Sequence, residues 1–291
     1  MGVPDDFLSS IPKPTKTYHK TTYDRISPAN NSAKGKTIVI TGGGTGIGYA
    51  IAVAFAQAGA ARLILVARSP GPIAEAKSTI EAAHPETKVE TIQASMTDAK
   101  AMTDLLTNKG DIDVLVLCAA AFAFGPSTKV SVKDVQDSFD TNVVASYQMT
   151  QTYISTPALK SGEAKTLINI STASIQLDLP NQVAYGSSKA AFGKLLQYVS
   201  QEHTPASGIR IFSQHPGALY TPAAASIMPK DAFPWEVIEI PAWQCVWLAA
   251  AKEADALHGK FFWAAWDVDE LLAVVKERAG EPAFLTLGVH M

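Results

Sequence analysis

A chain of 291 residues that is 47% hydrophobic and 18% charged can bury a substantial core, and this composition excludes a disordered protein. Its formal net charge of -3 offers no basic field to a nucleic-acid backbone, and two cysteines, Cys118 and Cys245, are too few for a disulfide scaffold. We see no secretory signal and no apolar run long enough to cross a bilayer, so we expect a cytoplasmic protein that binds neither nucleic acid nor membrane.

The first 35 residues carry four prolines among Ser, Thr, Asn and Lys. This composition predicts an irregular, extended N-terminal arm rather than a packed element. No break in composition follows, so we expect residues 36–291 to form a single domain.

From Lys36 onwards, short apolar or β-branched runs alternate with stretches of helical periodicity. The runs predict seven strands, at Thr37–Thr41, Arg62–Ala67, Val89–Ala94, Val114–Ala119, Thr166–Ser171, Ile209–Gln214 and Lys260–Ala265. Helices are predicted from Ile47 to Gly59 and at Ile73–Ala83, Ala99–Leu106, Val132–Leu159, Ala184–Glu202, Ile240–Ala251 and Asp269–Arg278. This alternation is typical of an α/β protein with the doubly wound Rossmann fold: a seven-stranded, mostly parallel sheet with helices on both faces.

Four glycines lie between the first predicted strand and the helix that follows it, in Thr41-Gly42-Gly43-Gly44-Thr45-Gly46-Ile47-Gly48. Glycine lets a backbone turn tightly and approach a pyrophosphate, whose charge the free N–H groups of a helix N-terminus attract. A plain strand-to-helix turn is the alternative. Because the loop lies in the first βαβ unit, we favour a dinucleotide site.

The second predicted strand ends at Ala67 and is followed by Arg68-Ser69, with no acidic residue. A carboxylate at this point of the fold would bind the free ribose 2′-hydroxyl of NAD, whereas Arg68 could hold the 2′-phosphate of NADP and Ser69 could add a hydroxyl. A solvated surface arginine is the alternative. We therefore expect NADP(H) in preference to NAD(H).

Tyr185 and Lys189 are four residues apart on a predicted helix and so share one of its faces. A phenol is a weak acid and base near neutral pH, and a nearby ammonium group stabilises its anion. The spacing alone is common on helix surfaces, so the pair gains its meaning from the phosphate loop upstream.

Taken together, these motifs resemble the short-chain dehydrogenase/reductase family over roughly residues 36–267. The TGxxxGxG motif of that family matches Thr41–Gly48, its YxxxK matches Tyr185–Lys189, and its PGxxxT matches Pro216–Thr221. The resemblance implies that Tyr185 gives a proton to a substrate carbonyl while Lys189 binds the nicotinamide ribose and lowers the pKa of the tyrosine. It also implies that Asn142 supports a water-linked proton relay.

The carbonyl-binding serine of the family lies thirteen residues before its tyrosine, where this chain has Thr172. Ser171 and Ser174 stay candidates for the same role, and a hydroxyl that only satisfies backbone groups is the alternative. The extra methyl group of threonine makes its orientation harder to predict.

The resemblance further implies a set of cofactor contacts. These are Gly42, Gly44, Thr45, Gly46, Ile47, Gly48, Arg68, Ser69, Ser95, Met96, Ala119, Ala120, Tyr185, Lys189, Pro216, Gly217, Leu219 and Thr221. Two departures weaken it: Leu117-Cys118-Ala119-Ala120 stands where the family has NNAG, and Ser95 stands where it has an adenine-binding aspartate. We expect different bracing of the sheet at the first departure, and Asp98 to cap a helix.

The segment at about 217–243 is rich in Ala, Pro, Met and aromatic residues and resembles the substrate lid of the family. With Phe122 and Phe124 it would form an apolar cavity for a hydrophobic or aromatic ketone, although ordinary core or subunit packing explains such residues equally well. A C-terminal tail at about 267–291 could cover this lid or contact another subunit. The family implies a homodimer or homotetramer, and no histidine or cysteine spacing suggests a metal.

We therefore expect an NADP(H)-dependent enzyme that reduces a hydrophobic or aromatic ketone to a secondary alcohol, or the reverse. Its KGKTIVITGGGTGIG opening resembles fungal family members of specialised metabolism. A non-redox isomerase, cyclase or dehydratase, and a protein that senses NADP(H) without turnover, are the alternatives.

Overall fold

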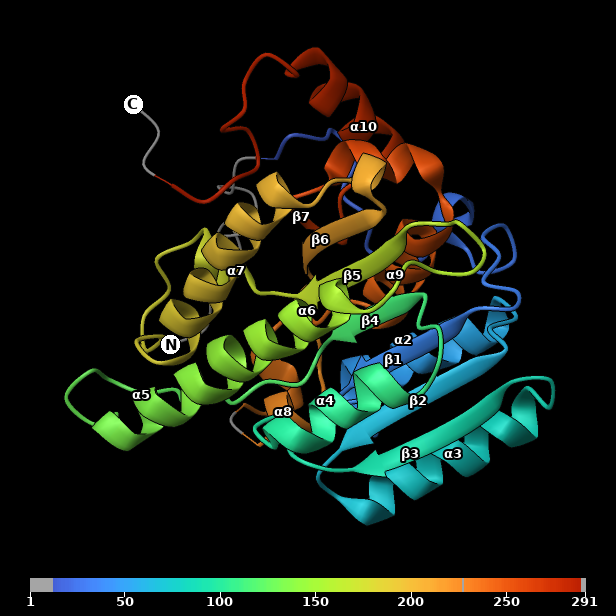
Figure 1. Ribbon diagram of the computed structural model, residues 1–291. Helices are drawn as coiled ribbons and strands as arrows, with labels where there is room; N and C mark the ends of the chain where they lie inside the picture. The colour runs from blue at the N-terminus through green and yellow to red at the C-terminus, as the bar shows by residue number, and fades with distance from the viewer. Residues whose placement is uncertain (1–12, 227, 289–291) are drawn as a thin grey trace.

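The computed structural model describes residues 13–226 and 228–288, and its centre is one seven-stranded sheet in the order β3-β2-β1-β4-β5-β6-β7 (Figure 1). All neighbouring strands are parallel. The strands are β1 Thr37–Thr41, β2 Arg62–Ala67, β3 Lys88–Gln93, β4 Val114–Leu117, β5 Lys165–Ile170, β6 Ile209–His215 and β7 Phe261–Trp263. The predicted doubly wound fold is confirmed, and the sheet is parallel throughout rather than mostly so.

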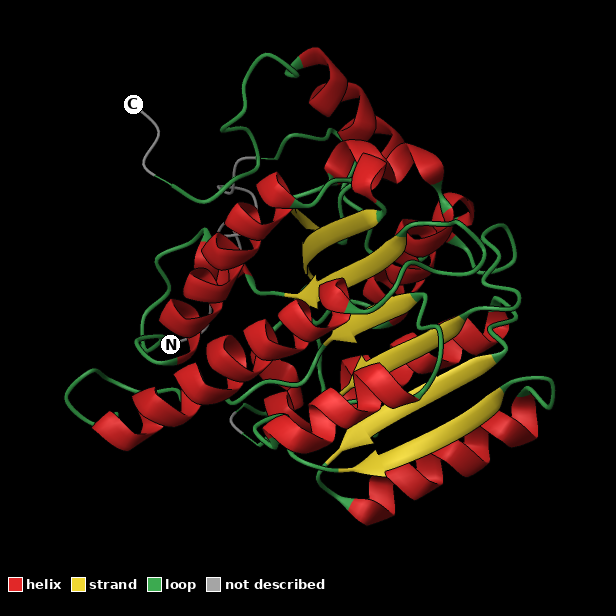
Figure 2. Cartoon of the chain, viewed as in Figure 1, coloured by secondary structure: helices red, strands yellow, loops and turns green. Residues whose placement is uncertain are grey.

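Helices cover both faces of this sheet (Figure 2). They are α2 Gly46–Gln57, α3 Pro70–Ala83, α4 Ala99–Asn108, α5 Val132–Phe139, α6 Ser146–Ser155, α7 Tyr185–Glu202, α8 Pro222–Ala225, α9 Glu239–Ala250 and α10 Val268–Glu277. Alternate strand residues point to opposite faces. In β1, Ile38 and Ile40 pack in the core under α2, α3 and α9, whereas Val39 packs in the core under α4, α6 and α7. Burial on both faces explains why the strands are nearly continuous apolar runs.

The long helix predicted from Val132 to Leu159 is wrong in its detail. A turn of π-helix at Asp140–Ala145 separates α5 from α6, and α6 ends at Ser155 before Pro157. Proline cannot continue a helix beyond its first turn, and it disfavours helical backbone in the residue before it. π-turns occur mostly at functional positions, and this one holds Asn142.

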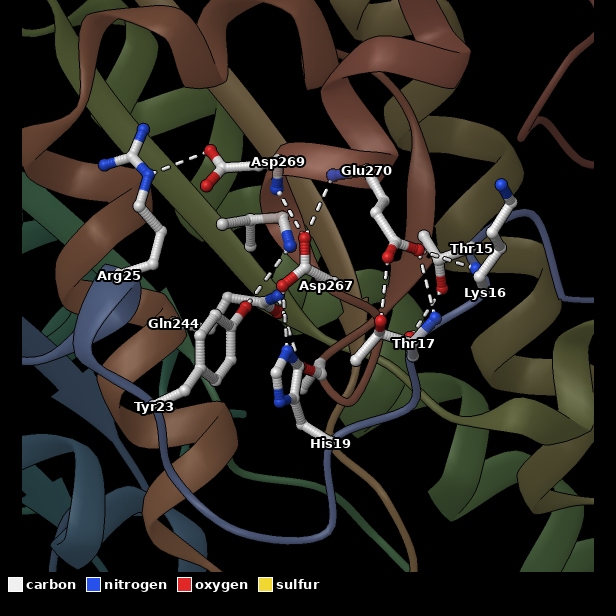
Figure 3. Close-up of polar contacts among 12 residues, drawn as sticks. Thr15, Lys16, Thr17, His19, Tyr23, Arg25, Gln244, Asp267, Asp269 and Glu270 are labelled. Atoms are coloured by element: carbon white, nitrogen blue, oxygen red, sulfur yellow. Dashed lines mark hydrogen bonds and ion pairs between the residues drawn. The ribbon is translucent and has the colours of Figure 1, made fainter.

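Residues 13–35, which we call the N-terminal strap, are irregular as predicted apart from a short 3-10 helix at Asp24–Ile26. The expectation that this segment does not pack is wrong for the described part, because Ile26 is fully buried in the core beside α9. Figure 3 shows the strap bound to α10: Glu270 accepts hydrogen bonds from the backbone of Lys16 and Thr17, and His19 contacts Asp267 at 2.9 Å. The strap's prolines therefore interrupt regular structure without keeping the segment off the domain.

The C-terminal tail, residues 279–288, lies against β7 and α7. The carbonyl of Leu285 accepts from the Phe261 N–H at 2.8 Å, and the carbonyl of Leu287 accepts from the Lys194 ammonium at 2.8 Å. β7 is the last strand of the sheet, so the tail covers an edge that would otherwise expose unpaired backbone groups. From the sequence, the tail could either cover the lid or contact another subunit. The hydrogen bonds of Leu285 and Leu287 instead join its described part to β7 and α7.

Candidate active site

The sequence-predicted site residues gather at the carboxyl ends of the strands. The order of the sheet reverses between β1 and β4, because the chain passes from β1 through β2 and β3 at one side before returning to β4. In open parallel sheets a ligand crevice forms at such a reversal, outside the carboxyl ends of the two strands. The glycine-rich loop follows β1, and the segment Cys118–Phe124 follows β4.

Glycines are required in the β1–α2 loop for two separate reasons. Gly42 has φ of +71° and Gly46 has φ of +55°, a region that favours glycine. A Cβ at Gly48 would lie 2.3 Å from the carbonyl oxygen of Gly42, so no larger residue fits there. The loop thus leaves a cradle bounded by backbone, and the first turn of α2 offers N–H groups that have no partner within the helix. This arrangement fits a dinucleotide pyrophosphate.

Thr41 braces the strand end where the family motif would have asparagines. Its hydroxyl oxygen accepts from the backbone N–H groups of Cys118 at 2.9 Å and Ala119 at 3.1 Å. The different bracing expected from Leu117-Cys118-Ala119-Ala120 is therefore supplied, at least in part, from β1. A Cβ at Gly42 would lie 3.1 Å from the Ala119 backbone, so loop and strand end are in close contact.

The residues predicted to reach the adenosine lie at the ends of β2 and β3. Arg68 and Ser69 are exposed, and the Arg68 guanidinium has no hydrogen bond or ion pair with any residue that the structure describes. Ser95 is half-buried and its hydroxyl contacts that of Thr97 at 2.8 Å, while Met96 is buried. Asp98 accepts from the Ala101 N–H at 3.0 Å and caps α4, as predicted.

Tyr185 is buried at the first turn of α7, beneath two aromatic side chains. The ring of Phe122 stacks on it with centroids 4.9 Å apart, and the ring of Phe124 lies tilted at 5.1 Å. Burial raises the pKa of the Tyr185 phenol, and a hydrogen bond with the Thr172 side chain opposes this shift. The phenol is therefore protonated at neutral pH and able to donate.

Lys189 lies one turn further along α7, and its ammonium group donates to the carbonyl oxygen of Ile170 at 2.7 Å. Burial lowers the pKa of Lys189 to about 8. This pKa is close enough to neutrality that the charge of the side chain changes within the working range of many enzymes.

Thr172, Ser171 and Ser174 all line the same cavity, but their hydroxyl groups differ in their hydrogen-bond partners. The Thr172 side chain lies near enough to the Tyr185 phenol to oppose the rise of its pKa, and the Thr172 hydroxyl contacts that of Ser174 at 3.2 Å. The Ser171 hydroxyl is buried and has no partner among the described residues. Of the three side chains, that of Thr172 is the one that opposes the rise in the pKa of the phenol.

Asn142 sits in the π-turn and joins three segments of the chain. Its amide oxygen accepts from the Ala121 N–H at 2.8 Å, and its amide nitrogen donates to the Ala121 carbonyl at 3.0 Å and to the Ser188 hydroxyl at 3.0 Å. These contacts tie the loop after β4 to α7. Asn142 is therefore held beside the helix of Tyr185 and Lys189 without touching either of them directly.

A cavity of about 830 Å³ opens above these groups. Its walls include Ile47, Ala120, Thr172, Tyr185 and Lys189, together with Pro216, Gly217, Leu219 and Thr221 after β6. Phe122, Phe124, Met228, Phe233 and Trp235 also line it, as the lid prediction requires. Tyr220 instead packs against Trp235, with ring centroids 5.2 Å apart. Among the predicted catalytic residues, Asn142 lies outside this wall. The predicted cofactor contacts outside it are Gly42, Gly44, Thr45, Gly46, Gly48, Arg68, Ser69, Ser95, Met96 and Ala119.

The site includes polar and aromatic residues that were not predicted as functional, among them His215, Trp263 and Glu236, with Tyr18 bound behind Glu236. His215 and Trp263 line the cavity from the ends of β6 and β7. Glu236 accepts from the Tyr18 hydroxyl at 2.7 Å and from the Ala218 N–H, so the strap reaches the cavity wall. The position of His215 directly before Pro216-Gly217 was the one available signal; nothing in the sequence links Tyr18 to Glu236.

The other histidine contacts described are structural. His258 accepts from the Ile211 N–H at 3.0 Å and contacts the Ser200 carbonyl at 3.0 Å. Within residues 13–226 and 228–288, no three His, Cys, Asp or Glu side chains are placed to hold a metal ion. Over the same residues, no helix has the length and apolar character needed to span a membrane.

Comparisons with known proteins agree on one family. A family model described as short chain dehydrogenase matches residues 36–232. The chain is 44% identical over 283 residues to the short chain dehydrogenase/reductase nsrO of Aspergillus novofumigatus, covering 96% of this chain and 97% of that protein. Among solved structures, a candidate 2-deoxy-D-gluconate 3-dehydrogenase from Agrobacterium tumefaciens with bound NADP aligns at a TM-score of 0.71 and 26% identity, covering 80% of this chain and 95% of that one. A 7α-hydroxysteroid dehydrogenase complexed with NADH aligns at a TM-score of 0.70 and 20% identity, over 84% and 97% of the two chains, which shows a shared fold alone.

Proposed function

Because the chain belongs to the short chain dehydrogenase/reductase family, we propose that it is an NADP(H)-dependent oxidoreductase that reduces a hydrophobic or aromatic ketone to a secondary alcohol, or catalyses the reverse. The observation that carries this proposal is the buried Tyr185, which lines an apolar cavity together with Thr172 and Lys189. A neutral phenol beside a fixed hydroxyl is a pair of donors for one carbonyl oxygen.

The glycine cradle between β1 and α2 fits the pyrophosphate of a dinucleotide, and Arg68 at the end of β2 suits the 2′-phosphate of NADP. The 2′-hydroxyl of NAD would find no carboxylate at this position. When bound, the nicotinamide supplies or accepts the hydride.

The residues of the chain supply the rest of the chemistry. Tyr185 donates its proton to the ketone oxygen as negative charge develops there, and the Thr172 hydroxyl donates a second hydrogen bond to the same oxygen. Lys189 holds positive charge next to the site and binds a ribose hydroxyl. Asn142 orients the loop after β4 and serves a water-linked path that returns a proton to Tyr185.

The aromatic walls of the cavity suggest the substrate class. Phe122, Phe124, Phe233 and Trp235 offer flat apolar surfaces and exclude water from the reacting carbon. A small polar sugar would leave these surfaces unpaired, so a ring ketone of specialised metabolism is the better fit.

The direct test is Tyr185→Phe, assayed by NADPH oxidation with a panel of hydrophobic ring ketones. We expect kcat to fall by about 10²-fold or more, because the proton donor is lost, while NADPH binding followed by fluorescence stays within about twofold. A Tyr220→Phe variant is the control, since Tyr220 lies outside the cavity wall. Full turnover by Tyr185→Phe would overturn the proposed acid, and a product of unchanged mass would overturn redox chemistry altogether.

A further inference from the structure

His215 is the last residue of β6, and it forms part of the wall of the site cavity. It pairs in register with Trp263 of β7, and the two rings meet edge to face with centroids 4.6 Å apart. The residue is 9% exposed, so its imidazole is almost enclosed by protein on every side except that of the cavity.

One nitrogen of this imidazole is hydrogen-bonded to the backbone. Nδ1 of His215 accepts a hydrogen bond from the Ala173 N–H at 3.0 Å. A backbone N–H can only donate, so Nδ1 must present its lone pair, and the single proton of a neutral imidazole then sits on Nε2. Burial lowers the pKa of His215 to about 3, so the ring is neutral at ordinary pH.

The other nitrogen is a donor without a protein acceptor. None of the described residues accepts a hydrogen bond from Nε2 of His215. Nε2 is also not one of the described side-chain atoms that are both fully buried and without a hydrogen-bond partner. An unpaired nitrogen that is not fully buried is accessible from solvent or from a cavity. The cavity that His215 lines is the site cavity. Nε2–H is therefore the unpaired donor that His215 can offer to a cavity whose walls are mostly apolar.

An unpaired N–H donor in a largely apolar cavity favours a ligand that places an oxygen acceptor beside it. A carbonyl oxygen has two lone pairs, and the two donors already assigned to the reacting ketone are Tyr185 and Thr172. A third donor fits a different acceptor atom on the same molecule. A site that is built to pair a substrate oxygen discriminates strongly against an analogue that lacks it, because its own polar group would be left unpaired.

We propose that His215 is a specificity-determining residue whose Nε2–H recognises a second oxygen of the substrate, a carbonyl or ring hydroxyl distinct from the group that is reduced. The substrate class is thus an oxygenated ring ketone rather than a plain hydrocarbon ketone. This inference rests on the proposed function for the identity of the reacting group, although the binding contact itself needs no turnover.

The test uses 1-tetralone and the four hydroxy-1-tetralones with the hydroxyl on the aromatic ring, with the full chain and NADP present. In protein labelled with ¹⁵N-histidine, the His215 signals are identified by their loss in His215→Phe. We expect the free protein to show the Nε2–H tautomer, and at least one hydroxytetralone to shift the Nε2 resonance while 1-tetralone leaves it in place. We expect that compound to bind wild type about tenfold more tightly than 1-tetralone, as one neutral hydrogen bond would predict.

Variants separate recognition from structure. His215→Phe should lose this tenfold preference and bind 1-tetralone as wild type does, whereas His215→Gln, which keeps one acceptor and one donor, should retain part of it. His203→Phe, at the end of α7 outside the cavity wall, is the control. The inference is overturned if wild type prefers no hydroxytetralone, if Nε2 does not shift on binding, or if His215→Phe keeps the preference. Tight binding without NADPH turnover would instead overturn the redox proposal and leave this contact intact.

Discussion

Lys189 changes its charge near neutral pH, because burial lowers its pKa to about 8. Burial raises the pKa of Tyr185 and lowers that of His215 to about 3, so neither of them titrates near neutrality. A lysine is cationic below its pKa and neutral above it. The cationic form of Lys189 is thus fully present only on the acid side of about pH 8.

We therefore expect kcat/KM for ketone reduction to be level below about pH 7 and to fall as the pH rises through about 8. Initial rates of NADPH oxidation in overlapping buffers measure this profile, and kcat/KM reports the free enzyme. The His215→Gln variant should show the same descending limb. A profile that stays level beyond about pH 9 would mean that Lys189 does not govern the rate.

The second prediction for a single side chain concerns Arg68 and the choice between NADPH and NADH. If it holds the 2′-phosphate, Arg68→Ala should raise the KM for NADPH by about 10- to 100-fold and leave that for NADH nearly unchanged, since NADH has no such phosphate. Arg68→Asp should reverse the preference. The control is Arg278→Ala, an exposed arginine at the end of α10. Equal KM changes for both cofactors would contradict the assignment.

Single residues also show where sequence-based prediction ends. The Tyr185–Lys189 spacing and the glycine loop are local, so both were recognisable from the sequence. The role of His215 depends on a hydrogen bond from Ala173, which belongs to another strand end. The tautomer of His215 and the role of its Nε2–H can therefore be assigned only when the structure places β5 next to β6.

At the level of elements, most strand ends were predicted to within one residue. Parallel strands buried on both faces are continuous apolar runs, so composition alone marks them. β4 was predicted two residues too long, because Cys118 and Ala119 are small and apolar although the strand ends at Leu117. The π-turn around Asn142 was missed, because one extra residue only shifts the phase of the apolar pattern and the flanking helices, of 8 and 10 residues, are too short to reveal that shift.

The clamp formed by Tyr18, Glu236 and Ala218 connects the strap to the segment that follows β6. Gly217 lies beside it with φ of +102°, and a Cβ there would be 2.7 Å from a carboxylate oxygen of Glu236. Each of the two donors bound by Glu236 would lose its acceptor if that side chain were removed. The clamp therefore fixes the loop that is proposed to hold the nicotinamide.

We expect Glu236→Ala to lower the free energy of unfolding by about 1–2 kcal/mol, because it leaves two partly buried donors unpaired. It should also raise the KM for NADPH several-fold. Tyr18→Phe, which removes a donor rather than an acceptor, should cost less. Chemical denaturation and cofactor titration measure both effects, with the exposed Glu239→Ala as the control. If neither quantity changes in Glu236→Ala, the clamp contributes nothing to either.

On the scale of the whole molecule, the helical run 132–155 and α7 lie side by side (Figure 1). Both expose apolar side chains. Val144 and Tyr198 are each 60% exposed, and Tyr147 is 39% exposed. Exposed apolar side chains on neighbouring helices suit a symmetric interface between copies of the chain.

We expect the native mass to be two or four times 30.9 kDa by light scattering coupled to gel filtration. Val144→Glu combined with Tyr198→Glu should shift the protein toward the monomer, because two charges would be buried at the interface. Ala82→Glu on α3 is the control, since it is exposed on the other side of the sheet. A wild-type protein that stays monomeric at all concentrations would contradict this expectation.

The architecture as a whole was predictable because it repeats one unit, strand and helix, whose period the sequence displays. The parts that escaped prediction are the contacts between distant segments. The strap was expected to extend away from the domain, and its prolines justify the lack of regular structure. Its docking on α10 depends on Glu270, a carboxylate that lies far along the chain and has no local signature.

That docking has a consequence for how the protein is made. Thr17 and Glu270 are separated by 253 residues, so the segment that leaves the ribosome early must wait for its partner. At about 5–20 residues per second, this delay is roughly 13–50 s. Until then the strap lacks the contacts with α10 that hold it in place, and Tyr18 lies next to those contacts in the chain. The contact of Tyr18 with Glu236 is thus among the last that the described chain can secure.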